Sequence, residues 1–233
     1  MSPPVVFLGG NMATVVFITG QFTVTTPSAA KAGDLLVLAI GMRSAVSTVD
    51  SLDNNDPSAS GWTLVQLVAT ASNQVALYTR TLDGSETGTH TGKVTGSTNF
   101  QAAIVALRGL SSIPATGAAN DSVATTNHVC PSQTLGLYSG AFLGVIVVNG
   151  APPSALPGSL TADNLSGNDG TNGIMVSLVR PEVAGATGTK TGMSGGARTG
   201  VAASFQCVAQ SLAAGTGISF SPVGAIGLPL EGV

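Results

Sequence analysis

Two stretches of this sequence resemble each other at a distance of 100 residues, and this repetition constrains the fold more than any other feature. Residues 88–92 read Gly-Thr-His-Thr-Gly, and residues 188–192 read Gly-Thr-Lys-Thr-Gly. An arginine precedes each copy at the same offset (Arg80 and Arg180), and a pair of alanines follows each copy. Self-similarity at a fixed period indicates that one structural unit is present twice. A chain of 233 residues has room for two such units.

The composition favours strands and turns over helices. The chain has 31 glycines and many β-branched residues, which are typical of short strands joined by turns. Three apolar runs show no alternation with polar residues, so we expect them to be covered on both faces and central in their sheets: 35–40, 100–107 and 142–148. The sequence also predicts strands at 14–19, 22–26, 61–68, 74–82 and 89–97, and a long polar loop at 43–61.

The second half of the chain repeats the order of the runs in the first half. Residues 141–148 match 34–41 at an offset of 107, and residues 175–180 match 75–80 at an offset of 100. The differences in length fall in loops, as expected for a duplication. We predict an all-β protein with two tandem antiparallel β-sandwiches from an internal duplication. The expected divisions are an N-terminal arm (1–13), a first sandwich (14–110), a linker (111–121), a second sandwich (122–210) and a C-terminal apolar arm (211–233).

Both expected arms are apolar and are interrupted by glycine and proline. Two prolines and two glycines disfavour a regular element in 1–13. The segment 211–233 contains one charged residue, Glu231, whereas disordered tails are polar and charged. We expect this segment to pack either on its own sandwich or on a neighbouring subunit. The side chains expected to bind partners are Val5, Phe7, Leu8, Ile218, Phe220, Val223, Ile226, Leu228 and Leu230.

The low charge of the chain bears on its surface. Charged residues make up only 8%, against about 25% in an average soluble domain. Freely diffusing proteins normally keep a charged, mixed surface that resists association. We therefore expect neighbouring subunits to cover much of this surface, in a homo-oligomer or a larger assembly. The alternative is a monomer kept soluble by Ser, Thr, Asn and Gln.

Several classes of partner are disfavoured. A net charge of −3, with no two Lys or Arg residues adjacent, argues against nucleic acid. The sequence contains no run of about 18 apolar residues, so it predicts no membrane-spanning helix. The N-terminus lacks the basic region of a secretory signal, so we expect Cys130 and Cys207 to be buried and reduced, with a disulfide between them as the alternative. No residue pattern indicates a cofactor.

One acidic loop is a weak candidate for a calcium site. Asp50, Asp53 and Asp56 could supply the oxygen ligands that Ca²⁺ prefers. The glycine and the bidentate glutamate of an EF-hand are missing, so an exposed turn rich in Asp and Asn is the favoured interpretation.

Catalytic and sugar-binding patterns are also weak. His90 and His128 are the only histidines, and His90 aligns with Lys190, which favours a solvent-facing position over a catalytic base. Trp62, Tyr78 and Tyr138 could form a platform that stacks on sugars, but Trp62 directly follows a turn glycine and is more typical of a core residue.

A set of short motifs resembles a known family of domains. The motifs are Gly-Asp-Leu-Leu-Val at 33–37, Gly-Trp-Thr-Leu-Val at 61–65, Leu-Tyr-Thr-Arg at 77–80, Gly-Ser-Glu at 84–86 and Arg-Gly at 108–109. In this order they resemble the β-sandwich, jelly-roll-like domains in structural proteins of tailed bacteriophages. The resemblance covers residues 30–210.

The resemblance implies a fold and a setting rather than an activity. It implies a non-enzymatic virion component without catalytic residues, in particular a capsid decoration or cement protein. Its partners would be the major capsid protein or other virion proteins, and its location the virion, assembled in the host cytoplasm. The alternative functions are a receptor- or glycan-binding module of a tail fibre or spike and, with less support, a secreted hydrolase domain.

Overall fold

The computed structural model describes residues 5–44, 46–53, 60–70, 72–84, 88–97, 99–113, 118–135, 141–153, 156, 163–168, 171–179, 185–186 and 188–209. This part consists of antiparallel strands and contains no α-helix, which confirms the predicted all-β class. Within it there is accordingly no helix with the length and apolar character to cross a membrane.

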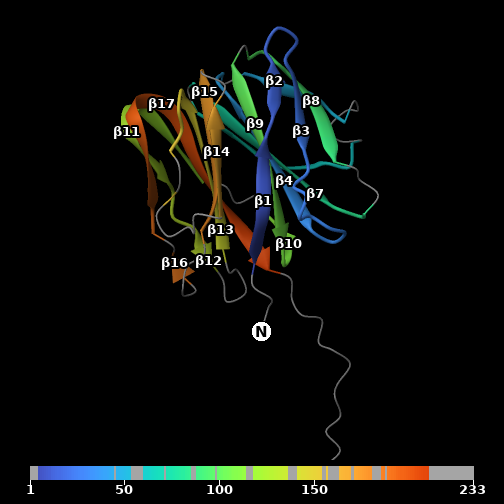
Figure 1. Ribbon diagram of the computed structural model, residues 1–233. Helices are drawn as coiled ribbons and strands as arrows, with labels where there is room; N and C mark the ends of the chain where they lie inside the picture. The colour runs from blue at the N-terminus through green and yellow to red at the C-terminus, as the bar shows by residue number, and fades with distance from the viewer. Residues whose placement is uncertain are drawn as a thin grey trace, which may run out of the picture.

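The strands form three main sheets (Figure 1). The outer sheet has the order β2-β3-β8-β5 (Thr14–Val16, Gln21–Thr25, Thr89–Thr95 and Thr48–Leu52). The middle sheet has the order β1-β9-β4-β7-β6 (Val6–Met12, Phe100–Arg108, Leu35–Met42, Gln74–Thr81 and Thr63–Ala69). The C-terminal sheet has the order β10-β17-β13-β15-β14 (Leu110–Ser112, Lys190–Ala209, Ala141–Asn149, Asn172–Val179 and Asn164–Asn168). β11 (Ala118–Cys130) also pairs with β17, and β12 (Thr134–Leu135) pairs with β16 (Gly185–Ala186).

The middle sheet is buried on both faces. Along β4, Leu35, Val37 and Ala39 belong to a core shared with the C-terminal sheet. The alternate residues Leu36, Leu38 and Ile40 belong to a second core, shared with the outer sheet. Successive side chains of a strand point to opposite faces, so a strand between two cores must be apolar at every position.

The same argument confirms the prediction for the three apolar runs. β4 lies between β9 and β7, β9 lies between β1 and β4, and β13 lies between β17 and β15. β13 faces the shared core with Leu143, Val145 and Val147, and its alternate residues face a third core. One core thus joins strands from both halves of the sequence.

The N-terminal segment differs from the prediction. Residues 6–12 form β1, which pairs with β9 at the edge of the middle sheet. The two glycines fit a bulged strand instead of ending it. Gly9 has φ of 129° at a shift in register, and a Cβ atom on Gly10 would lie 2.8 Å from the carbonyl oxygen of Ile104.

Two further boundaries were predicted wrongly, and one strand of the second half differs from the first half. The expected loop at 43–61 contains β5, an edge strand of the outer sheet. The expected linker at 111–121 contains most of β10 and the start of β11. β17 is one strand of 20 residues, whereas the corresponding residues of the first half form the separate strands β8 and β9.

Two strand pairs contribute to the shared core in the same way. Leu35 of β4 pairs with Leu107 of β9, and Ala141 of β13 pairs with Cys207 of β17. All four residues belong to the core between the middle and C-terminal sheets.

Candidate functional site

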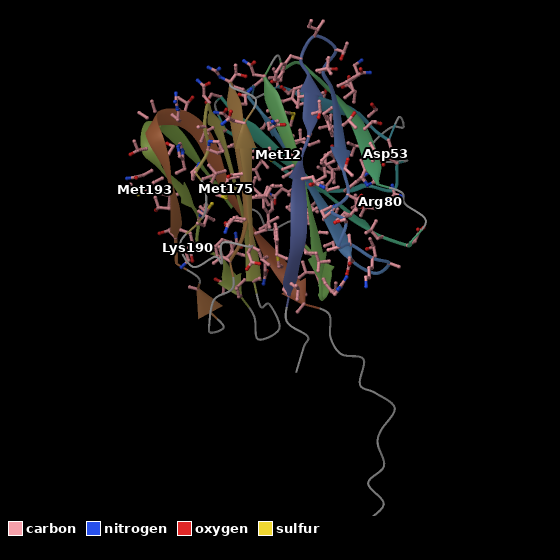
Figure 2. The ribbon with its side chains drawn as sticks, in the orientation of Figure 1. Met12, Asp53, Arg80, Met175, Lys190 and Met193 are labelled. Atoms are coloured by element: carbon pink, nitrogen blue, oxygen red, sulfur yellow. The ribbon has the colours of Figure 1, made fainter. Side chains whose placement is uncertain are left out.

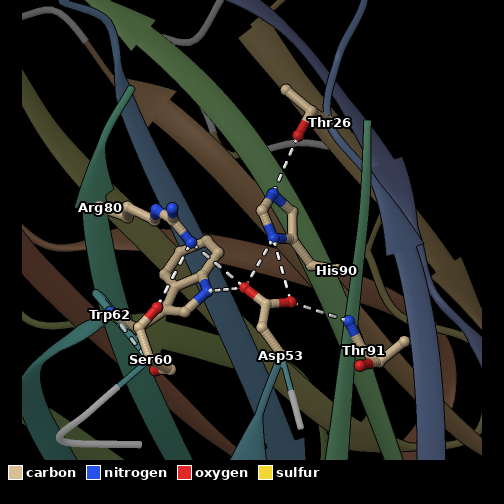
Figure 3. Close-up of polar contacts among 7 residues, drawn as sticks. All are labelled: Thr26, Asp53, Ser60, Trp62, Arg80, His90 and Thr91. Atoms are coloured by element: carbon tan, nitrogen blue, oxygen red, sulfur yellow. Dashed lines mark hydrogen bonds and ion pairs between the residues drawn. The ribbon is translucent and has the colours of Figure 1, made fainter. Parts of the chain in front are cut away.

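A partly buried carboxylate, Asp53, links the outer and middle sheets (Figure 3). Asp53 directly follows β5, and its Oδ2 accepts hydrogen bonds from Trp62 Nε1 at 3.0 Å and from an Arg80 guanidinium nitrogen at 3.3 Å. Its Oδ1 accepts from the backbone N–H of Thr91 at 3.1 Å. His90 Nδ1 lies 3.0 Å from Oδ2. Four groups from two strands and one loop therefore converge on one side chain.

The surroundings of Asp53 favour its ionised form. Burial alone would raise the pKa of the carboxyl group, but the hydrogen bonds from His90 and Trp62, the charge of His90 and the Thr91 N–H outweigh it. The pKa of Asp53 is therefore lowered, and the Arg80 guanidinium forms an ion pair with the carboxylate.

Asp53, His90 and Thr26 form a hydrogen-bonded series. A carboxylate only accepts, so His90 Nδ1 carries a proton toward Asp53, and His90 Nε2 lies 3.0 Å from Thr26 Oγ1. The order hydroxyl, imidazole, carboxylate is that of an activated nucleophile. However, His90 is only 4% exposed and lies edge-on against Trp62 at 5.1 Å between ring centroids. The backbone N–H of Thr26 donates to Gly88 O at 2.6 Å, so it is not available to stabilise an oxyanion.

The calcium prediction finds no support in this arrangement. The oxygens of Asp53 already accept from nitrogen donors, and Asp50 accepts from Thr48 Oγ1 at 2.8 Å and from Thr95. The hydrogen bond from Thr95 lowers the pKa of Asp50 despite partial burial. Asp56 lies outside the described residues. Across the part of the chain that the structure describes, no three His, Cys, Asp or Glu residues are grouped so that they could hold a metal ion.

A second ion pair fixes the start of β4 to the end of β9. Arg108 donates from two nitrogens to the two oxygens of Asp34, each at 2.8 Å, and the backbone N–H of Lys31 donates to Asp34 at 2.7 Å. Burial would raise the pKa of Asp34, but these bonds and the charge of Arg108 lower it. The Gly-Asp and Arg-Gly motifs of the sequence therefore meet in one structural contact.

The aromatic and thiol side chains are buried. Trp62 is 3% and Tyr78 is 5% exposed, so neither can stack on a sugar, and Tyr138 lies outside the described residues. His90 is buried as well, and its predicted solvent-facing position was wrong. Cys130 and Cys207 are free and buried as predicted, and burial raises the pKa of each thiol to about 12.

The expected partner-binding residues of the N-terminal segment lie against the chain's own cores. Val5 is 4% exposed in the core shared by the middle and C-terminal sheets. Phe7 packs against the same core, and Leu8 packs against the core under the outer sheet. The other six, Ile218, Phe220, Val223, Ile226, Leu228 and Leu230, lie outside the described residues, so their role stays a prediction.

An exposed apolar cluster, which sequence reasoning missed, lies at one end of the outer sheet. Val16, Phe17 and Ile18 are 49%, 36% and 99% exposed around the turn between β2 and β3, and Val46, before β5, is 80% exposed. Gly20, in the turn, lies beside the Val94 carbonyl near the end of β8, and Gly96, directly after β8, lies beside the Val46 carbonyl. The turn and Val46 therefore lie at the same end of β8. We call Val16, Phe17, Ile18 and Val46 the apolar tip.

Two features thus stand out: an internally saturated polar cluster and an apolar tip exposed to solvent. The first ties loops to strands, and the second is available to a partner. No family model, no curated protein and no solved structure matches this chain. The resemblance to phage structural domains therefore stays a prediction.

Proposed function

We propose that this chain is a non-enzymatic structural protein of a phage virion, a capsid decoration or cement protein that stabilises the shell through contacts between subunits. The observation that carries the proposal is a surface with few charges and an exposed apolar tip. The proposed partners are the major capsid protein or other virion proteins, together with further copies of the chain itself. The virion, assembled in the host cytoplasm, is the proposed location.

Surface chemistry supports an assembled state. The chain has 19 charged residues for its whole surface, and the tip exposes Ile18 and Val46 almost fully. Burial of such side chains on a neighbour contributes about 25 cal/mol per Å² of apolar surface. The free energy of each contact is small, but many copies on a shell would raise the overall affinity through avidity.

The strand order supports an internal duplication, which we also propose. The middle sheet contains the series β9-β4-β7-β6, and the C-terminal sheet contains β17-β13-β15-β14. The pair Leu35–Leu107 corresponds to Ala141–Cys207 at offsets of 106 for the first residue and 100 for the second. The pair Gln21–Lys93 corresponds to Asn127–Met193 at the same two offsets. The offset for β13 thus differs by one residue from the 107 of the sequence comparison. Two tandem sandwiches of jelly-roll-like form, packed face to face, are the arrangement that we infer from this correspondence.

A non-enzymatic role is supported by the state of the polar cluster. The groups that could act in catalysis are satisfied by one another, and the base candidate, His90, is buried. A glycan-binding module of a tail fibre has less support, because Trp62 and Tyr78 are in the core.

The proposal is tested by sedimenting the chain with empty shells of the phage that encodes it. We expect saturable binding by the unsubstituted chain, and at least a tenfold weaker binding by the double variant Ile18→Ser, Val46→Ser. Met193→Ser is the matched control, because Met193 is 72% exposed on β17, on the other side of the molecule from Asp53 and Arg80 (Figure 2). Failure to bind any shell, together with selective binding on a glycan array, would contradict the proposal and support the fibre alternative.

A further inference from the structure

A groove runs between the edge of the middle sheet and the strand that leads into the second half of the chain. It has a volume of about 370 Å³ and lies between β6 and β7 on one side and residues 111–113 on the other. Leu64, Val65 and Ile113 give it apolar walls, and serine and threonine residues, together with Arg80, line the rest. Leu64 is 49% exposed in the part of the chain that the structure describes.

The last described strand ends beside this groove. β17 pairs with β10 through Ala209 with Leu110 and Val208 with Ser112. Ser112 is itself a wall of the groove. The chain therefore leaves β17 next to the groove, with residues 210–233 still to follow.

The segment that follows matches the chemistry of the groove. Residues 211–233 carry one charge, Glu231, and their apolar side chains need cover. In 217–221 (Gly-Ile-Ser-Phe-Ser), Ile218 and Phe220 alternate with serines, which is the pattern of a strand with one apolar face. An extended chain advances about 3.3 Å per residue, so the residues from 210 to 217 can span on the order of 26 Å before that pattern begins.

We propose that residues 217–221 of the same chain lie in this groove, with Ile218 and Phe220 against Leu64 and Val65. Attachment to β17 gives the segment a high local concentration at its own groove, on the order of millimolar, which free copies do not reach. The same segment from a second copy would make the same contacts, as in strand exchange between subunits, and is the competing occupant. The proposal goes beyond the proposed function, since it concerns the free chain before any assembly.

The test measures the reactivity of a single cysteine in the groove. In the full chain with Leu64→Cys, we expect a thiol reagent to react at least tenfold more slowly than with Ile18→Cys, whose site is 99% exposed. Cys130 and Cys207 give a low background, because both are buried and their pKa is about 12. Adding Ile218→Ser and Phe220→Ser to the Leu64→Cys chain should restore fast labelling.

Each outcome decides the proposal. Protection that does not change over a hundredfold dilution supports occupancy by the same chain. Protection that disappears on dilution assigns the groove to a second copy, and equal labelling at both sites leaves the groove open; either result overturns the proposal.

As a second readout, mild oxidation of the double variant Leu64→Cys, Phe220→Cys should give a cross-link within one chain, whereas Ile18→Cys, Phe220→Cys should not. Shell binding is not involved, so failure here is separate from failure of the proposed function.

Discussion

The Asp53 cluster gives a prediction whose size follows from its geometry. In Asp53→Asn, an amide NH₂ replaces one carboxylate oxygen. If it replaces Oδ2, it faces the N–H of Trp62, whose indole nitrogen is 3.0 Å away in a residue that is 3% exposed. Rotating the amide by 180° is no remedy, because Oδ1 accepts from the Thr91 N–H at 3.1 Å. One buried donor therefore loses its partner in either orientation.

An unsatisfied buried donor costs about 1–3 kcal/mol, and the partly exposed ion pair with Arg80 adds little. We expect Asp53→Asn to lower the free energy of unfolding by about 2 kcal/mol. In a chain of this size, this corresponds to a fall in Tm of roughly 4–8 °C. The backbone contributes nothing to the change, because the φ of Asp53 is 51° and Asn tolerates that conformation as well as Asp does.

Chemical denaturation and thermal melting both measure this change. In the double variant Asp53→Asn, Trp62→Phe, the donor is absent as well, so the two substitutions should cost less together than the sum of each alone. A Tm for Asp53→Asn within about 1 °C of the unsubstituted protein would refute the reasoning. Full additivity in the double variant would refute it as well.

Three further predictions concern packing, pH and the thiols. A Cβ atom on Gly41 would overlap the Val147 side chain across the shared core, so Gly41→Ala should lower the unfolding free energy by about 1–3 kcal/mol, and Val147→Ala should recover part of the loss, as measured by denaturant titration. Burial lowers the pKa of His128, so the folded state disfavours its charged form, and stability should begin to fall as the pH drops below about 6.5; Tm measured against pH should lose this step in His128→Gln. Below about 3.8, protonation of Asp53, whose pKa is also lowered in the fold, should remove further stability. Cys130 should resist a thiol reagent in the native protein and react on unfolding, and fast native labelling would contradict its burial.

The central strands could be predicted from the sequence because burial on two faces leaves a direct signal. β4, β9 and β13 are apolar at nearly every position, whereas a strand with one face in water would carry a polar residue at every second position. The core position of Trp62 followed from an equally local argument, its place directly after a turn glycine.

The edges and faces could not be predicted in the same way. Gly9 and Gly10 were interpreted as breaks, but the bulge that accommodates them depends on the backbone of β9, which is distant in the sequence. The surroundings of His90 depend on Asp53, 37 residues away, and alignment with Lys190 gave no indication of that contact. The apolar tip consists of a turn and a separate residue, Val46, which only the outer sheet brings to the same end.

The most direct test of the proposed function counts copies of this chain on the shell. Purified empty shells are saturated with the chain and sedimented, and the bound copies are quantified against the major capsid protein. We predict saturation at a fixed ratio set by the symmetry of the shell, and loss of that plateau for Ile18→Ser, Val46→Ser. Binding that never saturates, or a plateau that the double variant leaves unchanged, would contradict the role of the apolar tip in a capsid protein.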